Sequence, residues 1–340
     1  MNRGHCEPVI LFPATIALVL LATFLSGRQA LAQSCSNSYA STRDVNLWPN
    51  GRIPYVFERT FADSGKPAIR EAMEDWMRSG AAIAFVEYTH PYTGGGPYVR
   101  IQVPFSGGEN SALGPVTPAP TVMNLHDGTA VNGRSHVVHE LGHAIGFPHE
   151  QSRPDRDIYV RVQTNNIILS FYPANFAVEP WTCWPPGSSL TPYDYGSIMH
   201  YDWCLGSVAG CGGGTKRTTD TMFAVDTSVQ YSTMGDWVGN LGATMSALDK
   251  ARVQQVYGKA IWVDVNSPCV FENGGFNCDF PATAGAYKSI GNAVAAVENP
   301  STLPVKLMIK TGTYTHNESQ TLRIAKPMKL LAWEYTVRIE

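Results

Sequence analysis

The 340-residue sequence predicts an α+β fold that is followed by a short β-rich module. Three observations lead to this prediction. Up to Gly258, strand-like segments share the chain with a few helices of clear apolar periodicity. One stretch, HELGHAIGFPHE from His139 to Glu150, holds three of the nine histidines of the chain. After Gly258 the composition changes to short strands separated by turns, which predicts a domain boundary near Lys259.

The first 32 residues have the pattern of a secretory signal peptide. Arg3 precedes an apolar run from Val9 to Leu25, and the small-residue site Ala30-Leu31-Ala32 follows. An uncleaved membrane anchor is the alternative, but the run is short for a span and Pro13 interrupts it. We therefore expect cleavage after Ala32, no stable membrane insertion, and a secreted protein that is extracellular or periplasmic. The chain has no long basic block, so we expect no nucleic-acid partner.

Six cysteines remain beyond the signal segment, and an even number in an exported chain favours disulfides. Proximity in the sequence suggests Cys269–Cys278, and Cys183 with either Cys204 or Cys211. Cys35 is the sixth.

Several elements are expected before the histidine-rich stretch. A turn at Pro49–Gly51 leads into a strand that ends at Phe57, and a helix with one apolar face begins at Pro67 and ends at Gly80. The segment 106–120 is expected to be a loop. Further strands are expected at 83–88, 98–104 and, at the edge of the sheet, 121–125.

The histidine-rich stretch predicts a metal site on a helix that Ser135 caps. His139 and His143 lie at positions i and i+4, on the same helical face, and both can bind one zinc ion. Glu140 is rotated by roughly 100° and can take a proton from a water at the metal. Gly146 ends the helix and turns the chain, which brings His149 back as the third ligand. A solvated helix face is the alternative for the first two histidines alone.

The complete spacing H-E-x-x-H-x-x-G-x-x-H is the signature of the metzincins. Their second mark is a methionine turn beneath the metal, and Met199 in YGSIMHYDW is the candidate. The stretches LWPNGRIPYVF, HELGHAIGFPHEQSRPDRDIYV, SIMHY and SALDKARVQQVYG closely resemble the astacin family across residues 47–258. This resemblance implies a two-lobed zinc endopeptidase that acts on proteins or peptides, with the zinc helix at the floor of the cleft.

The resemblance also implies roles for two further residues. Glu150 corresponds to the glutamate that receives the mature amino terminus. Tyr201 corresponds to a displaceable fifth zinc ligand that stabilises the oxyanion. The family's two disulfides are absent here. The short segment 33–46 is interpreted as the trimmed amino terminus, although Cys35 or Asp44 could instead hold the zinc as a brake. A charged cluster close to Glu150 is interpreted as structural ion pairs: Arg153, Asp155, Arg156 and Asp157.

The catalytic part is expected to close with a helix from Ser246, where Ser246 and Asp249 form a capping box. Leu248, Val253 and Val256 are expected to face inward. Residues 260–340 resemble the opening of a right-handed parallel β-helix of the pectate-lyase-like kind. Fewer than three repeats are present, whereas a solenoid needs at least about three for stability. The module is therefore either truncated or packed on the protease. The elements expected there are a helix at 287–298 and strands at 261–265, 305–309, 321–324, 329–332 and 337–339.

The sequence is compatible with two roles for this carboxy-terminal module. It could contact a polysaccharide or a surface, or it could be a structural appendage. The rival to a protease is an accessory protein with an inert metal site that presents this module to a carbohydrate. A polysaccharide lyase is a third reading.

Overall fold

The computed structural model separates the chain into two compact units, residues 1–34 and 35–340. It describes residues 47–104, 108–126, 133–172, 175–210, 218–235, 243–278, 284–297, 301–314, 324, 326–333 and 337–339. The expected signal peptide, the segment 33–46, Cys211 and most of the strand expected at 321–324 lie outside these residues. Within them, no helix combines the length and hydrophobicity that a membrane span requires.

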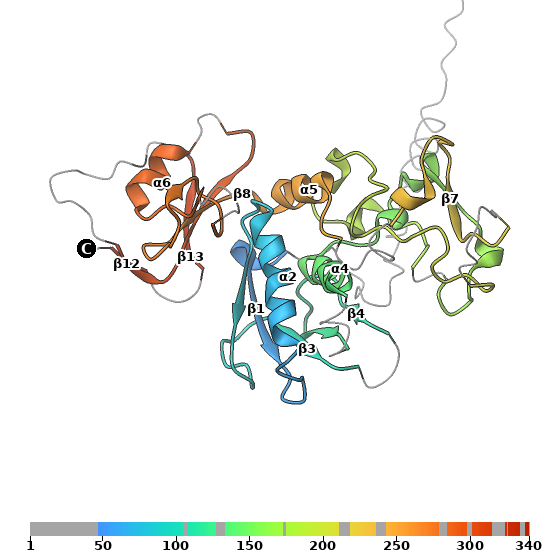
Figure 1. Cartoon of the computed structure of the whole chain (residues 1–340), viewed down its shortest axis with the longest axis horizontal. Helices are drawn as coiled ribbons and strands as arrows, with labels where there is room; N and C mark the ends of the chain where they lie inside the picture. Colours follow the sequence, from blue (N-terminus) through green and yellow to red (C-terminus); the bar gives the residue numbers. More distant parts are fainter. Residues whose placement is uncertain are drawn as a thin grey trace, which may run out of the picture. The chain divides into compact units, whose positions relative to one another are not determined.

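A five-stranded sheet lies in the part of the chain that precedes Gly258 (Figure 1). Its order is β2-β1-β3-β5-β4, with four parallel strands and an antiparallel β4. The expectation that 121–125 forms the edge is wrong, because β4 arises inside the expected loop and pairs with β5. A two-residue strand has no periodic pattern, which is why the sequence did not reveal it. The strands are β1 (Arg52–Phe57), β2 (Ala84–Glu87), β3 (Val99–Gln102), β4 (Asn110–Ser111) and β5 (Thr121–Asn124).

Two helices pack against each other beside this sheet, α2 (Lys66–Arg78) and α4 (Arg134–Ile145) (Figure 1). The Trp76 indole donates to the Val138 carbonyl over 3.0 Å, which fixes the contact between them. The expected cap at Ser135 is wrong: the N-cap is Gly133, and Ser135 is buried in the first turn. The Arg134 guanidinium pairs with Asp75 of α2 at 2.6 Å, and this tertiary contact holds the first turn in place.

Between residues 146 and 246 the described chain is largely irregular. The described residues of this stretch form one antiparallel strand pair, β6 (Val160–Val162) and β7 (Met222–Ala224). Short 3-10 helices supply most of the remaining regular structure: η1 (Pro49–Gly51) before β1, and η2 (Glu150–Ser152), η3 (Arg156–Ile158), η4 (Thr164–Asn166), η5 (Trp181–Cys183), η6 (Ser188–Leu190) and η7 (Tyr231–Thr233) after α4.

Helix α5 (Ala247–Tyr257) closes this part of the chain, and its Ser246–Asp249 capping box is confirmed. Its expected inner face is only partly right. Val253 is buried, but Leu248 and Val256 are half-exposed. The buried positions of α5 are instead Asp249, Arg252, Val253 and Tyr257.

The carboxy-terminal residues form small parallel sheets. The largest has the order β13-β11-β8, and all of its described pairs are parallel. Helix α6 covers a separate apolar cluster that includes Val263, Ala293 and Leu307. The Cys269–Cys278 disulfide is confirmed, and Cys183 and Cys204 are also disulfide-bonded. The elements are β8 (Lys259–Val263), β9 (Phe271–Glu272), β10 (Ala284–Gly285), α6 (Ile290–Ala296), β11 (Val305–Ile309), β12 (Gly312–Tyr314), β13 (Lys329–Ala332) and β14 (Val337–Ile339).

Candidate metal centre

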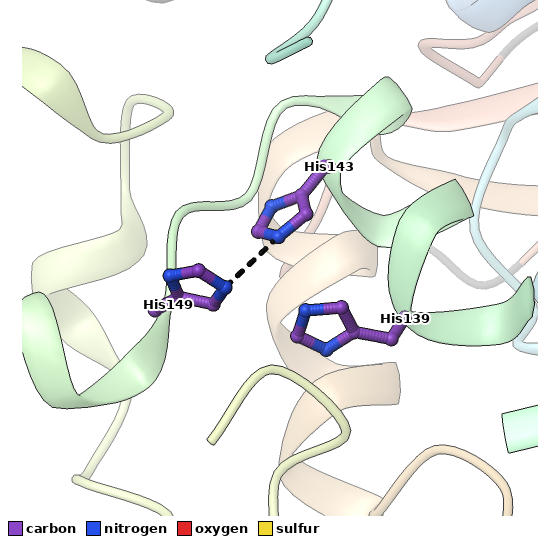
Figure 2. Close-up of side chains that lie close together, drawn as sticks. All are labelled: His139, His143 and His149. Atoms are coloured by element: carbon purple, nitrogen blue, oxygen red, sulfur yellow. Dashed lines mark hydrogen bonds between the residues drawn. The ribbon is translucent and has the colours of Figure 1, made fainter. Parts of the chain in front are cut away.

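Three buried histidines gather at the end of α4 (Figure 2). His139 and His143 project from the helix, and His149 comes from the segment that follows the turn. One ligand atom from each lies within 4.8 Å of the other two. The Nε2 atoms of His143 and His149 are only 3.1 Å apart. The structure thus brings together the three residues that the sequence predicted.

The turn at Gly146 makes this convergence work. Gly146 has a φ of 117°, and its N–H donates to the carbonyls of Gly142 and His143. A side chain at this φ would be strained, whereas glycine adopts it readily. The helix therefore stops one turn after His143, and His149 returns to the face that carries the other two histidines.

Backbone carbonyls set the tautomers of two of the imidazoles. Nδ1 of His139 lies 2.6 Å from the Ile198 carbonyl, and Nδ1 of His143 lies 2.7 Å from the Phe147 carbonyl. A carbonyl oxygen can only accept, so each Nδ1 carries the proton and donates it. The Nε2 lone pairs are then left to ligate a metal, which is the usual arrangement in histidine metal sites.

The three imidazoles are also in the protonation state that metal binding requires. Burial lowers the pKa of His139 and His149 well below the ordinary range, and it lowers the pKa of His143 to about 4. All three are therefore neutral at pH 7. A set of three neutral imidazoles with room for one more ligand is the donor set of catalytic zinc sites.

Glu140 lies in the same cavity of about 200 Å³ as the three histidines. A backbone hydrogen bond from Ser111 of β4 reaches its carboxylate. Its Oε2 is buried and has no hydrogen-bond partner among the described residues. Burial raises the pKa of Glu140 well above the ordinary range, and the charge of Glu109 adds to this. A carboxylate with one oxygen free of partners can accept a proton from a molecule in the cavity.

Met199 packs directly beneath the zinc helix and is 1% exposed. A Cβ added to Gly142 would collide with the Met199 sulfur, so the glycine in HELGH admits this side chain. The turn that contains Met199 is held by Asp249 of α5. The Asp249 carboxylate accepts hydrogen bonds from the Ser197 hydroxyl at 2.6 Å and the Ile198 N–H at 2.8 Å. The sequence interpretation assigned Asp249 only to the helix cap.

The phenol ring of Tyr201 lies over His149, with 4.2 Å between the ring centroids. Its hydroxyl donates to Oδ1 of Asn175 at 3.1 Å. The Gln151 side chain accepts from the Tyr201 N–H at 3.0 Å and donates to the Asn175 carbonyl at 3.1 Å. Gln151 and Asn175 thus hold Tyr201 from two sides. The sequence interpretation missed both, although each lies in a segment that resembles the family.

Glu150 is fully buried in a network of charges. Arg252 donates to both of its oxygens, at 2.5 and 3.0 Å, and Arg153 donates to Oε1 at 3.0 Å. The Asp194 N–H also donates to Oε1, at 2.9 Å. The amino-terminal segment that was expected here lies outside the described residues. The neighbouring arginines and aspartates form the expected ion pairs, Arg153–Asp155 and Arg156–Asp157.

Comparison with known proteins agrees with this geometry. The model of the peptidase family "Astacin" matches residues 40–258, and the chain belongs to this family. The family is zinc-dependent, and the triad of His139, His143 and His149 is positioned to bind one zinc ion. The predicted astacin-like α+β fold is confirmed. The resemblance of residues 260–340 to a β-helix stays a prediction.

Individual relatives match the protease part of the chain. "Nematocyst expressed protein 6" from Nematostella vectensis is 35% identical over 170 residues, which are 50% of this chain and 56% of that protein. "Astacin-like metalloendopeptidase" from Mus musculus is 34% identical over 166 residues, 46% of this chain and 34% of that protein. The chain thus spans about half or less of the length of these curated relatives. Among solved structures, high choriolytic enzyme 1, a hatching enzyme zinc-protease from Oryzias latipes, has a TM-score of 0.50 at 24% identity. It is matched over all of its own length and 66% of this chain, and it supports the fold.

Proposed function

We propose that this chain is a secreted zinc endopeptidase that hydrolyses peptide bonds in proteins or peptides. The observation that carries the proposal is the position of Glu140. Its partner-free Oε2, judged among the described residues, is buried in the same cavity as three neutral imidazoles. Membership of a peptidase family supports the same reaction class.

His139, His143 and His149 would hold the zinc ion through Nε2. When bound, the ion supplies a Lewis acid that polarises the scissile carbonyl and lowers the pKa of a water. Glu140 takes a proton from the attacking water at Oε2 and later delivers it to the nitrogen of the leaving amine. The raised pKa of Glu140 suits both steps, because a carboxylate of ordinary acidity is a poorer proton carrier near neutral pH.

Tyr201 stabilises the charge that develops on the carbonyl oxygen. Its hydroxyl leaves Asn175 and donates a hydrogen bond to the oxyanion. Met199, Gly146 and Glu150 support the site without taking part in the chemistry. Met199 fills the space below the helix and Gly146 makes the turn. Glu150, the residue directly after His149, is anchored by Arg252 and Arg153.

We propose the following organisation for the chain: a signal peptide at 1–32, a short amino-terminal segment at 33–46, the catalytic domain at 47–258 and a β-helix-like module at 260–340. The parallel pairing of β8, β11 and β13 supports the last of these. A polysaccharide contact through that module stays a prediction.

The variant Glu140→Gln tests the proposal. We expect purified Glu140→Gln to keep one zinc per chain and to hydrolyse casein at least about 10²-fold more slowly than the wild type. The matched control is Glu71→Gln, which removes a 65% exposed carboxylate from α2 and should leave hydrolysis unchanged. In the same assay Tyr201→Phe should lower kcat by a smaller factor, since the oxyanion loses one donor. Hydrolysis by Glu140→Gln at the wild-type rate would rule out the role assigned to Glu140. A wild type that hydrolyses no casein would favour an inert site with an accessory binding role.

A further inference from the structure

Glu109 is a carboxylate of the catalytic cavity that the proposed reaction does not use. It immediately precedes β4 and lines the cavity together with Glu140 and the three histidines. The His126 N–H donates to its Oε1 at 3.0 Å. Among the described residues, no lysine or arginine forms an ion pair with Glu109, and its other oxygen has no partner. The side chain is half-buried, so it is exposed to whatever enters the cavity.

The described part of the protein supplies no cationic side chain to this cavity. The described residues that line it include two glutamates and no lysine or arginine. A zinc ion held by the three histidines would act on the reacting groups beside Glu140, and no lysine or arginine among the described lining residues pairs with Glu109.

We propose that Glu109 is a specificity-determining residue that selects peptides carrying a lysine or arginine side chain within three residues of the scissile bond. This inference rests on the proposed peptidase function and adds the substrate class to it.

The position of Glu109 on the sheet supports this assignment. β4 is an edge strand that pairs with β5 on one side, and an edge strand can align an extended peptide along its other side. A peptide in that position would pass Glu109 and Glu140 within a few residues of its own sequence. A basic side chain there would form a charge-assisted hydrogen bond in a half-buried setting. One such bond changes kcat/KM by about tenfold.

The test uses fluorogenic peptides that are identical except at one residue, which is Lys, Gln or Glu. This residue is scanned through the three positions on each side of the cleaved bond. For the wild type we expect at least one position at which the Lys peptide exceeds the Glu peptide in kcat/KM by about tenfold or more. In Glu109→Gln, whose amide oxygen can still accept from His126, we expect the ratio at that position to fall to within about twofold. In Glu109→Lys we expect the preference to reverse.

Two controls separate this role from a general effect of charge or folding. Glu272→Gln removes the same charge from the carboxy-terminal module, where Gln can still accept from Asn292, and should keep the wild-type ratio. The second control needs no variant: the Lys preference of the wild type should weaken between about 0.05 and 0.5 M salt, because ions screen the contact.

The outcomes distinguish this inference from the proposed function. A wild type that cleaves these peptides without any charge preference, or a Lys preference that survives in Glu109→Gln or is insensitive to salt, overturns the inference and leaves the peptidase intact. Failure of the wild type to cleave any peptide, or cleavage that does not depend on Glu140, overturns the proposed function itself.

Discussion

Replacing Arg252 with methionine should destabilise the fold more than any substitution in an exposed ion pair. Arg252 and Glu150 have side chains that are 2% and 0% exposed, and two hydrogen bonds join them. In Arg252→Met the apolar stem is retained, but Glu150 keeps only the donors on Oε1, from Arg153 and the Asp194 N–H. Among the described residues, Oε2 then has no partner.

The expected magnitude follows from this burial. Removing one partner of a buried ion pair costs about 3–5 kcal/mol, since the remaining charge stays out of water. Arg153 still faces Glu150, which places the expected loss of unfolding free energy near the lower end, about 3 kcal/mol. The control is Arg78→Met in the Arg78–Glu74 pair of α2, whose side chains are 37% and 34% exposed. It should cost less than about 1 kcal/mol.

Urea unfolding with intact disulfides and saturating zinc measures both values. The double variant Glu150→Gln/Arg252→Met should lose less stability than the sum of the two single variants, because it no longer buries an unpaired carboxylate. A loss below about 1 kcal/mol for Arg252→Met, or strict additivity in the double variant, would refute the reasoning.

Two further predictions concern the turn and the pH dependence. Gly146→Ala should cost about 1–2 kcal/mol and weaken zinc retention against a chelator, because φ is 117° there and His149 follows the turn; unaltered zinc affinity would contradict this. Burial raises the pKa of Asp249 from 3.8 to about 6, so the folded chain holds a proton between pH 4 and 6 that the unfolded chain releases. The stability that wild type gains from this group is therefore lost as pH rises through that window. In zinc-free urea unfolding, we expect the difference in unfolding free energy between wild type and Asp249→Asn to narrow by up to about 3 kcal/mol from pH 4 to pH 7. A difference that widens over this range would contradict the raised pKa of Asp249.

The metal ligands were predictable because their geometry is local. His139, His143 and His149 lie within eleven residues, and helical periodicity with one glycine fixes how they converge. Glu140 is placed by the same helix. The convergence of these four residues follows from the helix and the turn after it, so their spacing was sufficient to predict them.

The residues that support the site were not predictable in this way. Gln151, Asn175 and Asp249 act through contacts with distant segments, and no periodic pattern marks such contacts. Helix α5 illustrates the physical reason. Hydrophobic periodicity places Arg252 on the solvent side of the helix, because an arginine side chain is buried only where a carboxylate pairs with it. Its partner Glu150 is 102 residues away in the sequence.

The buried polar face of α5 explains how the distant parts of the metal centre keep their relative positions. Asp249 holds the Ile198 N–H, and the carbonyl of Ile198 accepts from His139 and sets its tautomer. One turn further along, Arg252 holds Glu150, the residue directly after His149. The first and third zinc ligands are thus tied to the same helix through two carboxylates. An apolar face on α5 could pack as tightly. It could not fix the direction of the Ile198 carbonyl or the position of Glu150, because apolar contacts are not directional. Directional contacts of this kind are the reason why a closing helix far from the zinc motif carries charged residues inward.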